Sequence, residues 1–405
     1  MQTFENQYNF RVSNQIKVIS ALRNGPLSLN DLADKLNVSF TAISKIVDQL
    51  VEADIVKRAN KKTKNVKRGR IPTYVKRNTS VGVTCAIDLG GKDLIVAICD
   101  LNNKILKKQI FSDVGLIIDQ NLDDIAKAIR EMLKAPEIDN RPLLGICISS
   151  PGMVKKDSGE FGVSYRVQSS KNSSPATYFF NEFNVPTHLY NDVKIAMVGE
   201  RMFGCIPSDA KDYMFLHLGG ACGVSFSFNG KLYQGKNGFC GELTQYKDPE
   251  CEPFMYQNQL ASIHQVAQYA QAIDPTLDII PPVDARPDKV RIAKLFHEGN
   301  EAVVKAVEMN AKINARQIIA YNDMLDFEYI VIEGDVLKYG EQYKEWLLKY
   351  INAYSINPFR AKILFSSLEE PTSLLGAIYQ ANNLYYLNRL EEITNQRNPN
   401  GNYDI

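Results

Sequence analysis

The chain lacks any apolar run long enough to cross a bilayer, which takes about 20 consecutive apolar residues in a helix. From its polar start, Met1 to Asn9, we expect no signal peptide. Among 405 residues there are only seven cysteines, an odd number, and none forms a CxxC pair. Cys85, Cys99 and Cys147 lie in apolar, strand-like runs, which predicts buried, reduced thiols. We therefore expect a cytoplasmic protein without a membrane helix.

One basic segment contains no acidic residue, and it lies in an N-terminal part whose net charge is opposite to that of the rest of the chain. Residues 1–80 carry fifteen Lys or Arg and six Asp or Glu, whereas the other 325 carry thirty-two and forty. The formal charge of +1 is thus the sum of +9 and −8. No acid interrupts Lys57 to Arg77. Because a small basic module points to a polyanion, we expect one end to bind nucleic acid and the rest another ligand.

Three short helices are predicted within residues 9–52. The first, over residues 9–24, ends at Asn24-Gly25-Pro26, because Gly and Pro do not continue a helix easily. Ser28 and Ser39 each provide an N-cap hydroxyl for a second and a third helix. Two short helices joined by a tight turn are typical of a helix-turn-helix, whose second helix enters the major groove. The candidate DNA contacts there are Ser39, Thr41, Ser44 and Lys45, the last three of them to bases.

A basic hairpin is predicted to follow. The segments Ile55–Lys57 and Thr73–Lys76 have the pattern of short strands, and Arg68-Gly69-Arg70-Ile71-Pro72 lies between them. Such a wing lays cations along phosphates or inserts an Arg into the minor groove. A small interaction domain with a merely solvated basic loop is the alternative, but the charge and the helical pattern together favour DNA. The candidate phosphate contacts are Lys61, Lys62, Lys64, Lys67, Arg68 and Arg70.

The remainder of the chain repeats a strand, a glycine turn and a second strand. Val81–Leu89 leads into Gly90-Gly91, and Tyr213–Leu218 leads into Gly219-Gly220. Glycine turns of this kind let backbone N–H groups approach an anion. The repetition predicts an α/β protein with an internal duplication and a cleft between two lobes. Further predicted elements are helices at 122–133, about 301–325 and 373–385, and strands at 143–149 and 329–334.

Several segments occur in an order that resembles a known family. They are Asp88-Leu89-Gly90-Gly91, Ser150-Pro151-Gly152, Tyr190-Asn191-Asp192, Asn229-Gly230-Lys231-Leu232, Gly238-Phe239-Cys240-Gly241-Glu242 and Leu375-Gly376-Ala377. With the helix-turn-helix and the wing, they resemble the ROK family of repressors, unassigned reading frames and sugar kinases, and in particular its repressors of the N-acetylglucosamine and xylose type. The resemblance covers nearly the whole chain.

The resemblance implies a fold and its domain boundaries. We expect an α/β protein with an N-terminal winged helix-turn-helix and a two-lobed, actin-like ATPase (ribonuclease H-like) ROK domain. The expected ranges are 1–80 for the head, 81–190 for the first lobe with a C-terminal helix at about 370–390, 191–369 for the second lobe, and 391–405 for a polar tail.

The resemblance also implies a sugar site in the cleft, with Gly152, Asn191, Asp192, Glu242 and Asn258 as candidate ligands. In the family's kinases the aspartate takes a proton from a sugar hydroxyl and the asparagine bonds neighbouring hydroxyls, work that suits these groups. Plainer alternatives stay open: a helix N-cap for Asp192, an exposed loop acid for Glu242 and a turn glycine for Gly152.

The phosphate loops depart from the family's kinase pattern. Asp88, Gly90 and Gly91 are retained, but Lys92 stands where the kinases have Thr. The second turn, Gly219-Gly220-Ala221, lacks the kinases' Thr, and Glu333-Gly334-Asp335 replaces three glycines with two carboxylates that would repel a triphosphate. We expect vestigial phosphate loops and no enzyme activity, with Asp192 as the one vestigial catalytic candidate.

The family's zinc signature is missing. Thr244-Gln245 stands where the family has Gly-His, and no cysteine cluster occurs between Asp248 and Gln259. A structural zinc needs about four N or S ligands. We expect neither a metal nor a cofactor.

Together, these features predict a sugar-responsive DNA-binding transcriptional regulator, a repressor of carbohydrate-utilisation genes. Its expected partners are operator DNA, a sugar or sugar phosphate, and further copies of itself in a homodimer or tetramer, without a membrane. Two alternatives remain: an ATP-dependent sugar kinase with a DNA-binding head, and a pseudo-kinase regulator gated by a protein partner.

Overall fold

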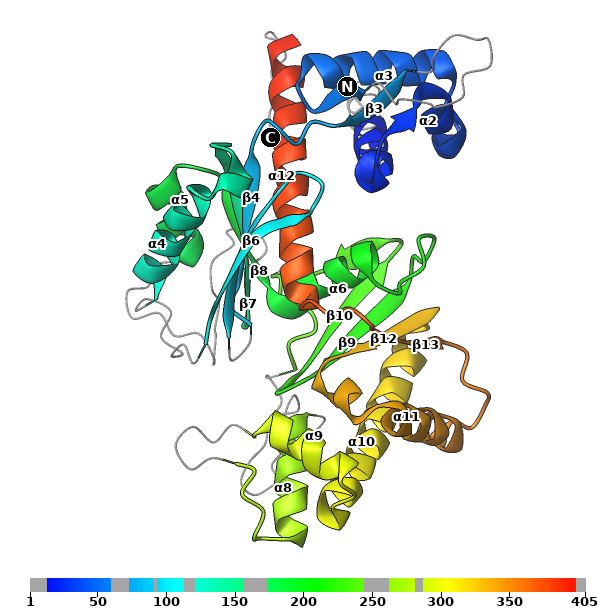
Figure 1. Cartoon of the computed structure of the whole chain (residues 1–405). Coiled ribbons are helices and arrows are strands. Elements are labelled where there is room, and N and C mark those ends of the chain that lie inside the picture. Colours follow the sequence, from blue (N-terminus) through cyan, green and yellow to red (C-terminus); the bar gives the residue numbers. More distant parts are fainter. Residues whose placement is uncertain are drawn as a thin grey trace, which may run out of the picture. The chain divides into compact units, whose positions relative to one another are not determined.

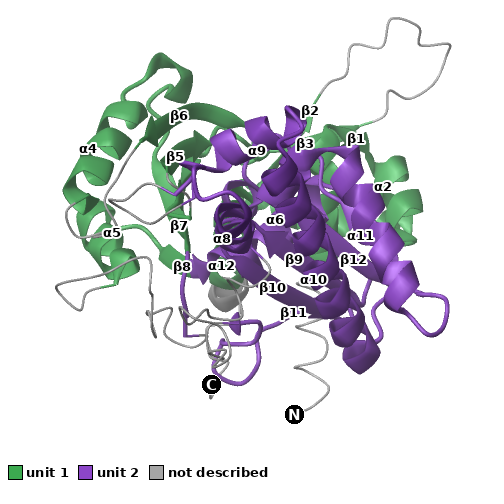
Figure 2. Cartoon of the chain, turned by 90° about the horizontal axis from the view of Figure 1, so that it is seen from below, with its two compact units in different colours: residues 1–150, 167–189, 377–405 green, residues 151–166, 190–376 purple. Residues whose placement is uncertain are grey.

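A computed structural model describes residues 13–59, 73–90, 93–112, 121–155, 174–243, 262–280 and 287–397. The chain divides into two compact units, shown in different colours in Figure 2. Unit 1 comprises the described residues of 1–150, 167–189 and 377–405, and unit 2 those of 151–166 and 190–376. Unit 1 is therefore made of three separate segments of the chain and unit 2 of two. Within the described residues, no helix is long and apolar enough to cross a membrane.

Both units contain a five-stranded sheet of the same topology. In sheet order, the strands of unit 1 are β6 (Ile105–Phe111), β5 (Leu94–Cys99), β4 (Val83–Asp88), β7 (Leu143–Ser150) and β8 (Thr187–Asn191). Those of unit 2 are β11 (Lys231–Tyr233), β10 (Cys222–Phe228), β9 (Tyr213–Leu218), β12 (Tyr329–Glu333) and β13 (Lys362–Phe365). In each sheet the first two strands along the chain are antiparallel, and the first pairs in parallel with the fourth. The predicted duplication is thereby confirmed.

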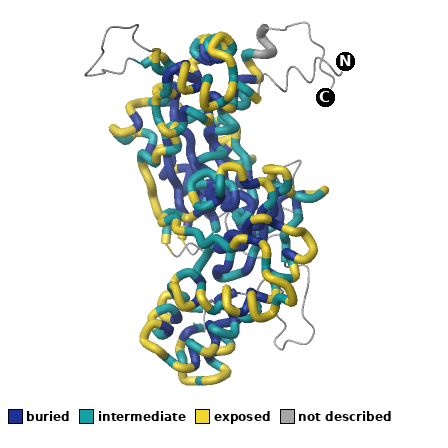
Figure 3. Tube along the Cα trace, turned by 90° about the vertical axis from the view of Figure 1, so that its right-hand side faces the viewer, coloured by how far each residue is buried: buried dark blue, intermediate teal, exposed yellow. Residues whose placement is uncertain are grey.

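Helices cover both faces of the sheet in unit 1. The helices α4 (Leu122–Leu133) and α5 (Pro175–Phe183) lie on one side and α12 (Thr372–Arg397) on the other (Figure 1). Thr84 on β4 donates a hydrogen bond to Asn382 on α12 at 2.7 Å. Every residue of β4 and β5 is buried, as expected for strands covered on both faces (Figure 3). Helix α12 continues to Arg397, well beyond the predicted end near 385.

The N-terminal head has the winged-helix arrangement. Its helices are residues 13–21, α2 (Leu29–Leu36) and α3 (Phe40–Glu52), and its sheet has the order β1 (Leu27–Ser28), β3 (Tyr74–Arg77), β2 (Val56–Ala59). Ser28 and Asp31 form a capping box, and Ser39 accepts a hydrogen bond from the backbone N–H of Ala42 at 3.3 Å. Both predicted caps are confirmed. Strand β1 was not predicted from the sequence.

Unit 1 also contains the junction between the head and the first sheet. The buried Arg77 donates from Nε to the Ile19 carbonyl at 2.9 Å and from Nη1 to the Leu101 carbonyl at 3.1 Å. Its guanidinium lies 5.6 Å from the ring centroid of Tyr386 on α12, and the Tyr386 hydroxyl donates to Leu101 at 3.0 Å. Leu101, Tyr386 and Leu390 belong to the head's apolar core. The head therefore packs on the first lobe and on α12.

Unit 2 packs its helices around the second sheet. They are α6 (Asp192–Phe203), α8 (Ile263–Ile273), α9 (Lys289–His297), α10 (Glu301–Leu325) and α11 (Glu341–Tyr354). The start of α12 crosses α6 at two glycines. A Cβ added at Gly199 would lie 2.1 Å from the carbonyl oxygen of Thr372, and one at Gly376 would lie 1.9 Å from that of Ile195. Only glycine lets two backbones approach this closely.

Candidate functional site

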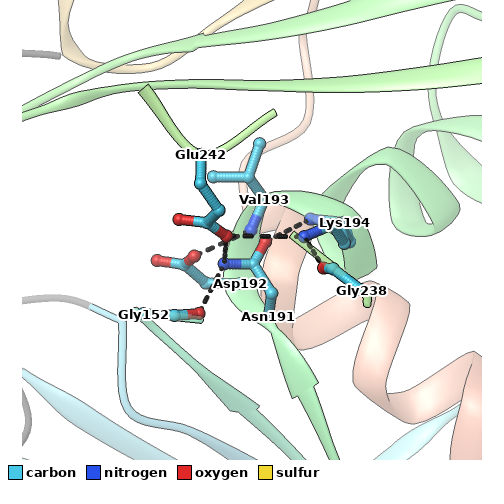
Figure 4. Close-up of polar contacts among 7 residues, drawn as sticks. All are labelled: Gly152, Asn191, Asp192, Val193, Lys194, Gly238 and Glu242. Carbon is cyan, nitrogen blue, oxygen red and sulfur yellow. Dashed lines mark hydrogen bonds and ion pairs between the residues drawn. The ribbon is translucent and has the colours of Figure 1, made fainter. Parts of the chain in front are cut away.

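The junction of β8 and α6 forms the centre of the candidate ligand site (Figure 4). Asn191 is the N-cap of α6, and its Oδ1 accepts a hydrogen bond from the backbone N–H of Lys194 at 3.0 Å. Its Nδ2 donates to the Gly152 carbonyl at 3.0 Å and to Glu242 Oε1 at 3.3 Å. One side chain thus connects three segments that are far apart in the sequence. The structure brings together Gly152, Asn191, Asp192 and Glu242, four of the five predicted sugar ligands.

Asp192 is the first residue inside α6 and not its cap. It is half-buried, and its Oδ1 accepts from the Val193 backbone N–H at 2.9 Å. An acid in the first turn of a helix is stabilised by the unpaired N–H groups there. The N-cap alternative for Asp192 is wrong, because Asn191 occupies that position.

Glu242 is held close to α6 by a tight turn. Gly241 has φ +84°, and a Cβ there would lie 2.0 Å from the Val224 carbonyl oxygen, so the turn requires glycine. The Glu242 side chain is only 13% exposed. Burial raises its pKa, and the charge of Asp192 acts in the same direction, whereas Lys194 opposes both. Because Glu242 is largely buried and bonded to Asn191, the exposed-loop-acid alternative is wrong.

Lys194 places a buried cation beneath this site. The residue is 4% exposed, and its Nζ lies 2.7 Å from the Gly238 carbonyl oxygen and 3.4 Å from Glu242 Oε1 (Figure 4). The site thus combines two carboxylates, one ammonium and one amide. Carboxylates that face a ligand accept hydrogen bonds from hydroxyl groups. The arrangement is suited to a polyhydroxyl compound.

The second and third glycine turns carry ion pairs. His217 Nδ1, near the end of β9, contacts Glu333 Oε2 at the end of β12. Burial lowers the pKa of His217, but Glu333 outweighs it and raises the pKa to about 9. Asp335 lies 3.2 Å from Lys289 Nζ and 2.8 Å from Lys338 Nζ. Although burial acts to raise the pKa of Asp335, these lysines hold it below its usual value.

These pairs change the predicted reason for weak nucleotide binding. Glu333 and Asp335 are not two unpaired carboxylates, because each has a cationic partner. The His217 ring also lies close to the second turn: a Cβ at Gly219 would be 2.5 Å from its Nε2. Gly220 follows in the same turn. In the first turn, Gly90 donates its backbone N–H to Asp88 Oδ1 at 3.1 Å, and Asp88 is buried.

The outer face of α3 is the candidate DNA interface. The exposed residues there include Ser39, Thr41 and Lys45, whereas Ser44 is half-buried. Asp48 forms an exposed ion pair with Arg58 at 2.5 Å, which connects α3 to β2. Phe40, the first residue of the helix, is 51% exposed and was not among the predicted contacts. The opposite face, with Ile43, Val47 and Leu50, is buried.

Some predicted residues lie outside the described part of the chain. They are Gly91, Asn258 and the six wing cations Lys61, Lys62, Lys64, Lys67, Arg68 and Arg70. Two polar residues of the sites were missed from the sequence: Lys194 and, as a partner of Glu333, His217. A signal existed for both, since Lys194 lies in the first turn of α6 and His217 two residues before a glycine turn. Within the described residues, no group of three or more His, Cys, Asp or Glu side chains is placed to hold a metal.

Sequence comparisons find similarity between this chain and known proteins. The sequence pattern of the ROK family matches residues 84–383, and that of a winged helix-turn-helix DNA-binding domain matches residues 13–57. The xylose repressor of Caldicellulosiruptor bescii is 23% identical over 377 residues, which cover 88% of this chain and 92% of the repressor. The N-acetylglucosamine repressor of Escherichia coli O157:H7 is 21% identical over 349 residues, 84% of each chain.

Solved structures show the same fold. A ROK family transcriptional regulator, described as a homologue of the Escherichia coli MLC protein, superposes with a TM-score of 0.75 at 18% identity, covering 95% of this chain and 99% of its own. A glucokinase from Streptomyces griseus, solved with glucose and AMPPNP, gives a TM-score of 0.63 at 18% identity, over 75% of this chain and all of the kinase. The second match leaves a quarter of the chain uncovered.

Proposed function

The chain belongs to the ROK family, and we propose on this premise that it is a sugar-responsive transcriptional regulator that represses carbohydrate-utilisation genes. The observation that carries the proposal is the winged helix-turn-helix packed on a ROK domain in one chain. Two relatives that span most of both chains are named xylose repressor and N-acetylglucosamine repressor. Cytoplasmic location, where operator DNA is found, is part of the proposal.

The DNA-binding surface would combine α3 with the wing. Thr41, Ser44 and Lys45 would reach base edges, with Ser39 at the helix N-terminus beside a phosphate. The wing cations named above would contact phosphates, and Arg70→Ala should weaken binding to all DNA sequences to a similar extent. A homodimer or tetramer would supply a second head, so that two half-sites lie one helical turn or a multiple apart. The boundaries expected at residues 80, 190 and 369 belong to the same proposal.

The ligand would be a sugar or sugar phosphate at the start of α6. Asp192 and Glu242 would accept hydrogen bonds from sugar hydroxyls. Asn191 would act mainly by positioning, because its amide is already bonded to Gly152 and Glu242. Ligand binding changes operator affinity only through its different affinities for two conformations of the protein.

Several features speak for regulation without catalysis. His217 lies over Gly219 and pairs with Glu333, and the lysine partners of Asp335 are already engaged within the protein. A triphosphate would have to replace these contacts, which favours vestigial phosphate loops.

A gel shift on the gene's own upstream DNA tests the proposal. The full chain would be titrated without sugar and with xylose, N-acetylglucosamine, glucose and their phosphates. We expect specific binding that one sugar weakens or strengthens. Binding that no sugar alters would favour a regulator gated by a protein partner, and no specific binding would overturn the proposal.

An ATP-dependent sugar kinase with a DNA-binding head is the second candidate. The retained Asp88 and Asp192 and the fold shared with the glucokinase favour it. Turnover of ATP with a hexose, abolished in Asp192→Asn, would establish this activity, since the family's aspartate is the general base. We expect no turnover above that of the variant.

A further inference from the structure

A buried ammonium is costly unless it is paired, so the position of Lys194 needs an explanation. Its side chain is 5% exposed, yet it extends from the first turn of α6, which also carries Asp192. Its partners, the Gly238 carbonyl and Glu242, both lie on the glycine-rich segment that carries Glu242. Lys194 therefore connects α6 to that segment.

This connection orients one oxygen of Glu242 toward the protein. Oε1 receives Asn191 Nδ2 at 3.3 Å and Lys194 Nζ at 3.4 Å. Oε2 receives no hydrogen bond from the described residues. Because Oε2 is also absent from the buried polar atoms that lack a partner, it is not fully buried. One carboxylate oxygen is thus fixed, while the other remains an acceptor for a ligand.

The donors of this site are already engaged. The Asn191 amide donates to Gly152 and Glu242, and Lys194 donates to Gly238 and Glu242. Glu242 Oε2, which receives no hydrogen bond from the described residues, is an acceptor, and the neighbouring Asp192 carboxylate is an acceptor group as well. Such a surface recognises a ligand that presents hydroxyl donors and disfavours an anionic group there.

We propose that Lys194 is a positioning residue that holds Glu242 in place as an acceptor for neighbouring hydroxyls on an uncharged part of a sugar. The inference rests on the proposed sugar-responsive function and deepens it. The groups that face Glu242 electrostatically are Lys194 and Asp192 on α6 and the thiol of Cys240 on its own segment. Lys194 is the one cation among them, so its loss leaves a buried carboxylate beside Asp192.

The first test needs no ligand. Thermal unfolding would be followed from about pH 5 to 8 for the wild type, Lys194→Met, Glu242→Gln and the double variant. Burial and Asp192 raise the pKa of Glu242 in the folded protein, and removing Lys194 raises it further. Because a raised carboxyl pKa makes folding take up a proton, Lys194→Met should be least stable at pH 8 and recover as the pH falls.

The double variant separates pairing from packing. Lys194→Met with Glu242→Gln has no carboxylate at position 242 to protonate, so the extra pH dependence of Lys194→Met should disappear. A loss of stability in Lys194→Met that is the same at every pH and persists in the double variant would overturn the ion-pair role of Lys194.

The second test measures the ligand. The probes are xylose, N-acetylglucosamine and glucose, with thermal stabilisation and operator binding as readouts. We expect the sugar that stabilises the wild type to bind Lys194→Met at least about tenfold more weakly, and Lys194→Arg to recover part of the loss. Operator binding without sugar should persist in Lys194→Met at low pH, which shows that the variant is folded.

The outcomes distinguish the inference from the function on which it rests. Unchanged sugar affinity in Lys194→Met overturns the positioning role while leaving the regulator intact. A wild type that binds operator but responds to no probe overturns the sugar-responsive function and the ligand role of Lys194 together, whereas the pH series still decides whether Lys194 and Glu242 form a functional ion pair.

Discussion

At the residue scale, the side chains of the sites form hydrogen bonds and ion pairs with one another in the absence of a ligand. Asn191 caps α6 and also bonds Glu242, and Asp335 is shared by two lysines. Charged groups that are partly buried are costly unless they are paired in this way. Removing one partner therefore has effects that depend on pH or on the ligand.

A single lysine tests base reading. Lys45 is exposed on α3, so Lys45→Ala should weaken binding to a specific operator by about 1–3 kcal/mol and leave random DNA nearly unaffected. Lys35→Ala, an exposed lysine on α2, is the matched control. Titrations of both DNAs by fluorescence anisotropy measure the difference. An equal loss on the two DNAs would show that Lys45 contacts phosphate.

The pair of His217 and Glu333 predicts a pH dependence of stability. The pKa of His217 is raised to about 9 in the folded protein, from about 6.5 in an unfolded chain. The protonated form is therefore favoured by folding, so the contribution is complete below about pH 6.5 and is lost as the pH rises through about 9.

Glu333→Gln removes the partner and should lower the melting temperature at pH 6 to 7 but hardly at all above about pH 9. Glu345→Gln, at an exposed position on α11, is the control and should change little at any pH. A uniform decrease for Glu333→Gln across the pH series would contradict the role assigned to His217.

At the element scale, elements with a local sequence pattern were predicted, whereas elements that depend on pairing with distant segments were not. Ser28 and Ser39 act within three residues of their own positions, and β9 is apolar at every position except His217. Such signals are visible in a single sequence. Strand β1 has only two residues and exists because it pairs with β3, which follows much later in the chain.

The candidate site was predicted only where a motif carried it. Asn191, Asp192 and Glu242 came from the family resemblance, and the structure brings them together. Lys194 binds a carbonyl 44 residues away, and His217 contacts a carboxylate 116 residues away. No local pattern contains contacts at such separations, because they are set by how the whole fold brings the segments together. Helices α5, α8, α9 and α11 were likewise not predicted.

The contact of α6 with α12 predicts a steric effect. In Gly199→Ala the new methyl group would meet the backbone of Thr372 and Gly376, so we expect a loss of about 1–3 kcal/mol in the free energy of unfolding. Gly145→Ala, whose Cβ would lie 3.3 Å from the Pro186 carbonyl oxygen, should cost less. Urea unfolding of both variants checks this, and equal costs would show that α6 and α12 separate easily.

At the scale of the whole molecule, α12 takes part in both units. Its first residues, up to Gly376, belong to unit 2, and from Ala377 it belongs to unit 1 with the head. Asn382 bonds Thr84, Tyr386 bonds Leu101 and Arg389 bonds the Ala53 carbonyl at 3.4 Å. One helix thus contributes residues to both units.

Arg77→Met tests this junction. The variant loses hydrogen bonds to the carbonyls of Ile19 and Leu101, so the head should detach more often at a cost of about 1–3 kcal/mol. We expect faster proteolysis near residue 80 and weaker operator binding, although Arg77 is buried. Lys76→Met, the exposed neighbour, should leave proteolysis unchanged. Identical cleavage rates for the two variants would contradict the junction.

The apolar core of the head has a practical consequence for protein engineering. Because Leu101, Tyr386 and Leu390 complete that core, the segment that ends with the last strand of the head does not contain the whole core. A chimera that exchanges residues 1–80 with those of a relative would place foreign side chains against the native turn at Leu101 and the native end of α12. Exchange of operator specificity between such proteins should therefore succeed when α3 alone is grafted, or when the last turns of α12 travel with the head.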